Sequence, residues 1–209
     1  MWIVRAAVAM SPESLEQAPI RYSHITPAGS WLVRRICAVI LSAWLGGILL
    51  VSLSAPAVFS AGEVVLRHPL PAHAGIIKLA GKDAVSDLLR YHAGEANNQV
   101  FALWGTMQVL YGAASLLLLL FFSDVGRWRL ILAASMLVLA LFQKLYLIPA
   151  IADASRRYRA GEVADMGQRF RLLHGSFATF EVVLALVGLA LLVLLLRSSG
   201  RGSRRRAGA

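Results

Sequence analysis

The sequence is poor in cysteine and in acidic residues, and both shortages narrow the classes of protein that it can represent. Its 209 residues include one cysteine, Cys37, and 11 Asp and Glu against 21 Lys and Arg. One cysteine excludes an internal disulfide and any metal centre that needs several thiolates. The sequence also lacks an HExxH zinc motif, a CxxC pair and a GxSxG nucleophile turn. No recognisable enzyme class is therefore indicated.

The excess of positive charge does not point to nucleic acid. Arginines cluster after residue 196 and flank the other hydrophobic segments, a distribution typical of topology signals and of contacts with anionic lipids. No nucleic-acid-binding motif accompanies them. We predict the lipid bilayer as the main partner, with anionic lipid at the basic tail and no nucleic acid; a homo-oligomer is compatible with the pattern.

The main feature of the sequence is a set of four long hydrophobic segments. Hydrophobic residues make up 58% of the chain, and mean hydropathy is +0.66. They gather at residues 36–59, 98–122, 128–148 and 173–196, each with about the 20 residues that cross a hydrocarbon core of about 30 Å. None of these segments has the charged face that a soluble bundle needs. The sequence predicts an all-α integral membrane protein, an up-down antiparallel bundle of four transmembrane helices.

The segments between and around the spans have their own patterns. We expect residues 1–30, with three prolines, to be an unstructured lead, residues 31–197 to form the membrane domain, and residues 198–209 to be a disordered basic tail. A competing interpretation makes the first span a cleaved signal peptide. Residues 74–91 have one apolar and one charged face, which predicts an amphipathic helix on the bilayer surface between spans one and two. Spans three and four are predicted to extend beyond the membrane and to turn at Gly161.

Positive charge close to the span ends suggests the orientation. Arg34 and Arg35 precede the first span, and the arginine cluster follows the last. Cationic residues near span ends stay in the cytoplasm, so both termini are predicted to be cytoplasmic, in a bacterial inner membrane.

Polar residues of the spans gather in the non-cytoplasmic half of the predicted bundle. This set consists of Pro56, Asn97, Asn98, Trp104, Gln108, Gln143, Lys144, Tyr146, Pro149, His174, Ser176 and Glu181. Glu181 is the most informative member, because a carboxylate inside hydrocarbon costs about 2.5–3.5 kcal/mol on insertion scales. Residues 174, 178, 181, 185 and 188 share one helical face, on which His174 and Glu181 are the titratable groups.

These residues form a candidate intramembrane polar cluster of Lys144, Glu181, His174, Gln108 and Gln143. Lys144 and Glu181 lie at matched depths in neighbouring antiparallel spans, so we predict that they pair inside the bundle. Each residue also has an ordinary interpretation. Lys144 could snorkel to the interface, His174 could be an interfacial residue, Gln108 could hold helices together, and the charge on Glu181 could be purely structural.

Three segments resemble the small four-helix membrane proteins related to eukaryotic transmembrane protein 205 and their bacterial relatives. They are APAVF at residues 55–59, AG at residues 74–75 and, most distinctive, RFRLLHGS at residues 169–176. The resemblance covers about residues 41–196. It implies a four-helix integral membrane protein without a settled biochemical activity.

Three functional classes follow. The first is a non-enzymatic membrane protein with a polar interior. The second is a transport or proton-relay component that uses Glu181, His174 and Lys144. The third is a haem or metal membrane protein, which is disfavoured because His174 is the only histidine at a span. We predict no cofactor.

Overall fold

The computed structural model describes residues 27–123, 125–159 and 166–197. Regular structure in these ranges is entirely helical, without a strand. The elements are α2 (Pro27–Arg67), α3 (Pro71–Ala80), α4 (Lys82–Phe122), α5 (Arg127–Phe142), the π-helix η1 (Gln143–Leu147), α6 (Ile148–Arg159) and α7 (Met166–Arg197). The predictions for the N-terminal lead, the basic tail and the turn at Gly161 lie outside the described residues, apart from the first turn of α2.

Four continuous helical stretches are long and apolar enough to cross a membrane: Ala28–Arg67, Lys82–Phe122, Arg127–Tyr158 and Gly167–Arg197. Each contains one of the four spans that the sequence predicts, which confirms the all-helical class and the four candidate spans. α2 and α4 have 41 residues each, or about 60 Å at 1.5 Å per residue. This is about twice the hydrocarbon thickness, so roughly half of each helix is surplus to a crossing.

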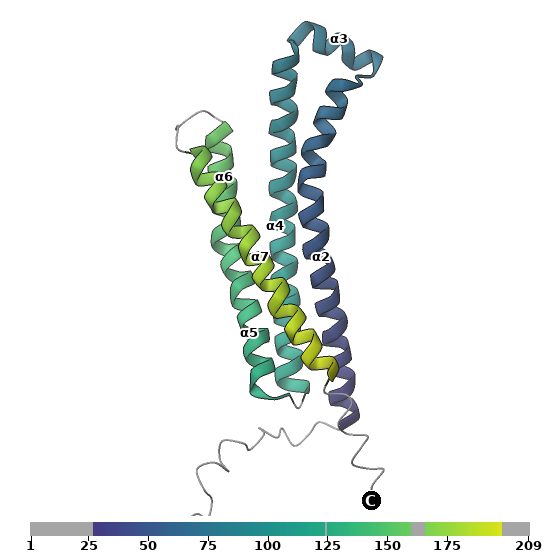
Figure 1. Ribbon diagram of the computed structural model, residues 1–209, viewed down its shortest axis with the longest axis vertical. Coiled ribbons are helices and arrows are strands. Elements are labelled where there is room, and N and C mark those ends of the chain that lie inside the picture. The colour runs from purple at the N-terminus through teal and green to yellow at the C-terminus, as the bar shows by residue number, and fades with distance from the viewer. Residues whose placement is uncertain (1–26, 124, 160–165, 198–209) are drawn as a thin grey trace, which may run out of the picture.

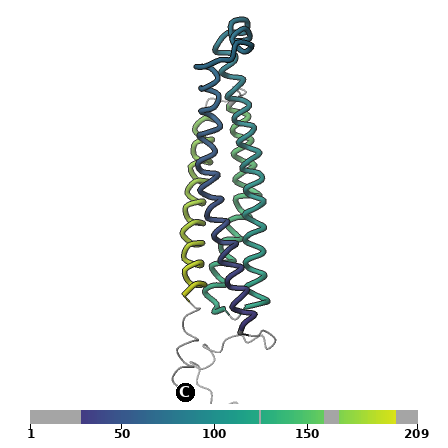
Figure 2. Tube along the Cα trace, turned by 90° about the vertical axis from the view of Figure 1, so that its right-hand side faces the viewer, coloured from purple at the N-terminus to yellow at the C-terminus, as the bar shows by residue number. Residues whose placement is uncertain are grey.

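The helices are arranged as a ring of four neighbours. α2 packs against α4, α4 against α5, α5 against α7, and α7 against α2. Among the described residues, the backbones of α4 and α7 do not come close to each other, and the two helices face each other across the diagonal of the bundle. α2 and α4 continue past the other helices to α3, as Figures 1 and 2 show. We call this the α3 end of the molecule.

The core follows the axis of this ring and is built from residues at helical spacing. On α2 the buried positions include Cys37, Leu41, Trp44 and Ile48, which share one face. On α7 they are Phe177, Glu181, Leu184, Gly188, Leu191 and Leu195. Most other side chains of the spanning stretches point outward and are apolar. Outward-facing apolar residues are expected of helices that are solvated by lipid.

The connection between α2 and α4 corrects the prediction of one amphipathic helix over residues 74–91. Gly81, with φ of +84°, separates α3 from α4, and this left-handed region favours glycine. Residues 82–91 therefore belong to α4 and continue along its axis. α3 has no buried residue, and Leu79 is 91% exposed. The predicted helix thus becomes the short cap of a long helical hairpin.

The end of the molecule opposite α3 is marked by tryptophan and arginine. Arg35 lies over the ring of Trp31, and Arg127 over that of Trp128, at 5.0 and 5.6 Å. Both tryptophans are exposed. Tryptophan and arginine at a helix end are typical of a membrane–water interface.

Candidate polar site

One face of α4 carries several of the polar groups inside the bundle. Asn97, Trp104 and Gln108 are buried, and Phe101 lies on the same face. Their spacings of four, three and four residues place them one above another along the helix. This face points to the centre of the ring, toward α7.

Glu181 meets this face across the diagonal. Its side chain is buried, and the Nε2 amide of Gln108 donates a hydrogen bond of 2.6 Å to its Oε1. Because α4 and α7 are not neighbours, two long side chains are needed to bridge the gap. This contact ties opposite helices together at the centre of the bundle.

Trp104 and Gln143 face the same carboxyl group from two further positions. Both present hydrogen-bond donors to it, in looser geometry than that of the Gln108 contact. Among the described residues, Trp104 Nε1, Gln108 Oε1, both amide atoms of Gln143 and Glu181 Oε2 are buried without a hydrogen-bond partner. Buried polar atoms are nearly always paired. We call Trp104, Gln108, Gln143 and Glu181 the Glu181 cluster.

The π-helix places Gln143 in this cluster. The backbone amide of Ile148 donates to the carbonyl of Gln143, five residues earlier, as a π-turn requires. Pro149 follows directly, and a proline both removes a backbone donor and crowds the carbonyl four residues before it. A wider turn just before the proline relieves this conflict. π-bulges of this kind are frequent at functional sites.

Two glycines make room for the cluster. A methyl group added at Gly47 of α2 would collide with the ring of Trp104, so this glycine lets the indole lie against the α2 backbone. At Gly105 an added methyl group would collide with Ile148 and crowd the stem of Lys144. Close packing at both sides of α4 therefore depends on small residues, as is usual in membrane bundles.

Lys144 does not pair with Glu181, contrary to the prediction from matched depth. Its ammonium group donates a hydrogen bond of 2.8 Å to the backbone carbonyl of Ala102, and its side chain is half-buried. Adjacent residues of a helix point in different directions around its axis, so when Gln143 faces the cluster, Lys144 is turned toward α4. The hydrocarbon stem packs along Gly105 and carries the charge away from the cluster.

His174 also lies apart from Glu181. It is exposed, stacks on Phe170 with ring centroids 5.7 Å apart, and meets the edge of Phe101 at 6.2 Å. The buried face of α7 includes Phe177 in place of residue 178, so it is rotated slightly from the face predicted to hold residues 174, 178, 181, 185 and 188. Of the five predicted cluster residues, the structure brings together Gln108, Gln143 and Glu181; Lys144 and His174 lie at the margin.

An aromatic layer separates the Glu181 cluster from the α3 end. Phe101 and Phe177 pack edge to face with centroids 5.1 Å apart, one helical turn from Trp104 and Glu181. Beside them lies a cavity of about 10 Å³, lined by Asn98, Phe101, Ile148, Ile151 and Phe177. This volume is about the least that holds one water molecule.

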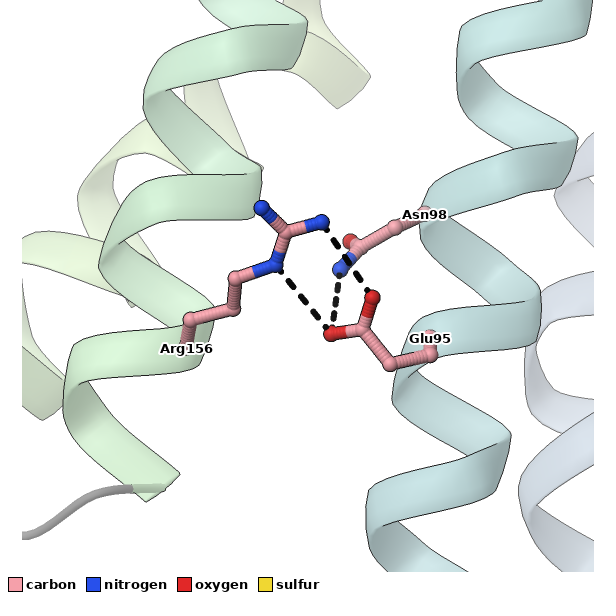
Figure 3. Close-up of polar contacts among 3 residues, drawn as sticks. All are labelled: Glu95, Asn98 and Arg156. Atoms are coloured by element: carbon pink, nitrogen blue, oxygen red, sulfur yellow. Dashed lines mark hydrogen bonds and ion pairs between the residues drawn. The ribbon is translucent and has the colours of Figure 1, made fainter.

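Beyond this layer a polar contact links α4 to α6. Figure 3 shows Arg156 reaching across to Glu95, with Asn98 beside it. Arg156 Nε and Nη2 lie 3.4 and 3.3 Å from the two carboxylate oxygens, and Asn98 donates to the same carboxylate at 3.5 Å. An exposed pair of this kind contributes little to stability. Sequence reasoning missed it, because nothing in either helix alone shows that they meet.

The fold and the cluster together describe a four-helix bundle with apolar outer faces and polar side chains at its centre. Its ligand-like groups are one carboxyl, two amides and an indole. No group of three His, Cys, Asp or Glu side chains that could hold a metal occurs within residues 27–123, 125–159 and 166–197. Comparisons with protein-family models, curated proteins and solved structures found no match.

Proposed function

We propose that the chain is a non-enzymatic, multi-pass membrane protein that crosses the bilayer four times as an up-down bundle. The four apolar helices support insertion. Tryptophans and arginines mark the end of the molecule opposite α3. They favour this opposite end as the cytoplasmic side, which would place both termini in the cytoplasm. A bacterial inner membrane and the relationship to proteins like transmembrane protein 205 stay predictions within this proposal.

Its interior serves as a binding site for a small polar solute, centred on the Glu181 cluster. The observation that carries this proposal is the set of buried polar atoms without a partner: five such atoms lie in four neighbouring side chains. A cluster whose only task is to join helices gains nothing from unpaired atoms, each of which costs about 1–3 kcal/mol. A bound solute that forms hydrogen bonds with these atoms would offset this cost.

A site kept for binding and a site kept for stability respond differently when the carboxyl group and both amides are removed. Replacing a complete buried polar network by apolar residues of similar volume is often neutral or stabilising. We therefore expect the triple variant Gln108→Leu, Gln143→Leu, Glu181→Leu to unfold in detergent at or above the temperature of the unmodified protein. Glu181→Leu alone should lose about 1–3 kcal/mol, because it leaves the Gln108 amide unpaired.

Leu184→Ala, one turn along the same buried face, is the matched control. It should lose about 2–5 kcal/mol as an ordinary core truncation, which shows that the assay detects damage to this region. A triple variant that is less stable than Glu181→Leu would mean that the polar groups hold the bundle together, and the binding proposal would be wrong.

Of the three residues that the transport or proton-relay alternative requires, only one lies at the centre of the bundle. Glu181 is positioned for it, whereas the exposed His174 and the tethered Lys144 do not contact it. A solute that reaches Glu181 from the α3 end has to pass the Phe101–Phe177 layer.

A further inference from the structure

The hairpin of α2, α3 and α4 continues past the end of the other helices (Figure 1), and its charged residues mark where it leaves the hydrocarbon. Residues 36–62 and residues 96–123 contain no charged residue, whereas residues 63–95 contain eight. Charged side chains in such number are placed in water and not in lipid. In the proposed topology, the end of α2, all of α3 and the beginning of α4 therefore lie outside the bilayer.

This extramembrane part of α4 keeps its charges on one side. Asp83, Asp87 and Arg90 follow one another at spacings of four and three residues, and the same spacing leads on to the buried Gly94. Residues spaced in this way share one face of a helix. The charged residues thus lie above the polar face of α4, on the side of the bundle axis.

The opposite side of the extramembrane hairpin is apolar and uncovered. Val64 of α2 is 58% exposed and Leu88 of α4 is 56% exposed. The two residues lie at nearly the same level, because α2 and α4 pack closely where Gly62 meets Leu89. Water covers apolar side chains at a cost, and a contiguous exposed apolar surface beyond the bilayer marks an interaction site.

This apolar side is the outer end of a longer face. On α2, exposed residues follow one another from 50 to 64 at spacings of three, four, three and four, the repeat of a helix–helix seam. On α4, Leu103 and Leu110 are exposed seven residues apart. We define the outer hairpin face as Leu50, Leu53, Val64, Leu88, Leu103 and Leu110. Lipid covers its middle, but lipid does not reach Val64 and Leu88.

We propose that a second copy of this chain covers the outer hairpin face. The two hairpins pack side by side around a two-fold axis parallel to the helices, with α2 of one copy against α4 of the other. A partner for this face has to cross the membrane beside it and then stay apolar to the same height in water. A second copy in the same orientation meets this requirement, because both copies have the same profile.

Charge and area are both compatible with this dimer. Residues 63–95 contain four acidic and four basic residues, so two hairpins do not repel each other through net charge. Two helices that are each about 60 Å long and about 10 Å wide present a face of about 1,200 Å². A stable interface needs about 800 Å² from each partner, so the face is large enough even if part of it remains in contact with lipid.

The first test measures the mass of the purified protein in detergent by sedimentation over a range of concentrations. We expect a dimer of the 22.6 kDa chain. Leu88→Glu should weaken it about tenfold or more, because it buries an unpaired carboxylate in the interface. Leu79→Glu is the matched control, since Leu79 is exposed on α3 and lies outside the outer hairpin face. It should leave the dimer unchanged.

The second test locates the interface in native membranes, where no substitution has to break it. Two differently tagged copies are co-expressed in a Cys37→Ala background, one with Val64→Cys and the other with Leu88→Cys. Oxidation should link the two tags by a disulfide. When Asp87→Cys replaces Leu88→Cys, the cysteine lies on the charged side and this link should be absent.

Three results would overturn the proposal. The protein could sediment as a monomer at all concentrations, or as a dimer that Leu88→Glu does not weaken. Cross-linking of Val64→Cys and Leu88→Cys only to a protein of another size would show that the partner is a different protein. None of these results depends on the Glu181 cluster, so they leave the proposed solute site to its own experiment.

Discussion

At the scale of single residues, neighbouring glycines of α2 have different surroundings. A methyl group at Gly47 would collide with the ring of Trp104, whereas an added methyl group at Gly46 would have no neighbour within 4 Å. The two positions therefore separate the effect of a close contact from the general effect of replacing glycine in a helix. Gly47 also determines how near the Trp104 indole comes to the α2 backbone, and hence where its Nε1 lies relative to Glu181.

We predict that Gly47→Ala destabilises the protein by about 1–3 kcal/mol, the usual cost of overpacking a well-packed core. The indole ring is rigid and buried, so it has to shift as a whole. Gly46→Ala should leave stability unchanged or raise it by up to about 1 kcal/mol, because alanine favours a helix more than glycine does. Thermal or denaturant unfolding in detergent measures both. Equal effects at the two positions would show that Trp104 does not pack against Gly47.

At the scale of elements, the long hairpin of α2, α3 and α4 changes the expected place of the segment between the first two spans. The sequence pattern of residues 74–91 is amphipathic and indicates a helix on the bilayer surface. In the structure, α3 stands at the far end of two helices that are about twice as long as a crossing needs. We therefore expect its apolar residues to lie in water, beyond the membrane.

This placement gives a labelling prediction in a Cys37→Ala background. Leu79→Cys on α3 should react with a membrane-impermeant maleimide added to intact cells or spheroplasts. Val138→Cys in α5 is the control, since Val138 is also an exposed apolar residue, at 63%, but lies in the middle of a spanning stretch. It should remain unlabelled.

Two other results would each contradict part of the proposal. Labelling of Leu79→Cys only after lysis would place α3 on the cytoplasmic side and reverse the orientation. Absence of labelling in opened membranes, with reaction only in detergent, would place α3 within lipid, as the sequence pattern suggests.

At the scale of the whole molecule, hydrophobic length was enough to predict the helical class and the positions of the four candidate spans. It was not enough to decide which polar side chains meet. Depth along each helix can be read from sequence, and Lys144 and Glu181 do lie in neighbouring helices. Which way each side chain points depends on the π-turn before Pro149, and periodicity with a uniform 3.6-residue repeat does not contain that turn.

The partner of Glu181 was harder still to predict, because Gln108 lies on the diagonally opposite helix. Sequence order favours contacts between consecutive spans, whereas the ring places the second and fourth helices across the centre. Three members of the cluster were accessible from sequence, since Gln108, Gln143 and Glu181 are rare polar residues in long apolar runs, whereas Trp104 was not predicted to belong to it. No sequence pattern around Gly47 indicates that this residue makes room for Trp104.

Two double-mutant cycles, measured side by side in the same detergent, test the central claim that Glu181 is bound across the bundle by Gln108 and not by Lys144. The first combines Gln108→Leu with Glu181→Leu, and the second combines Lys144→Met with Glu181→Leu. We expect a coupling free energy of about 1 kcal/mol or more in the first cycle. The second should be additive within about 0.5 kcal/mol. Additivity in the first cycle together with strong coupling in the second would contradict the arrangement of this site.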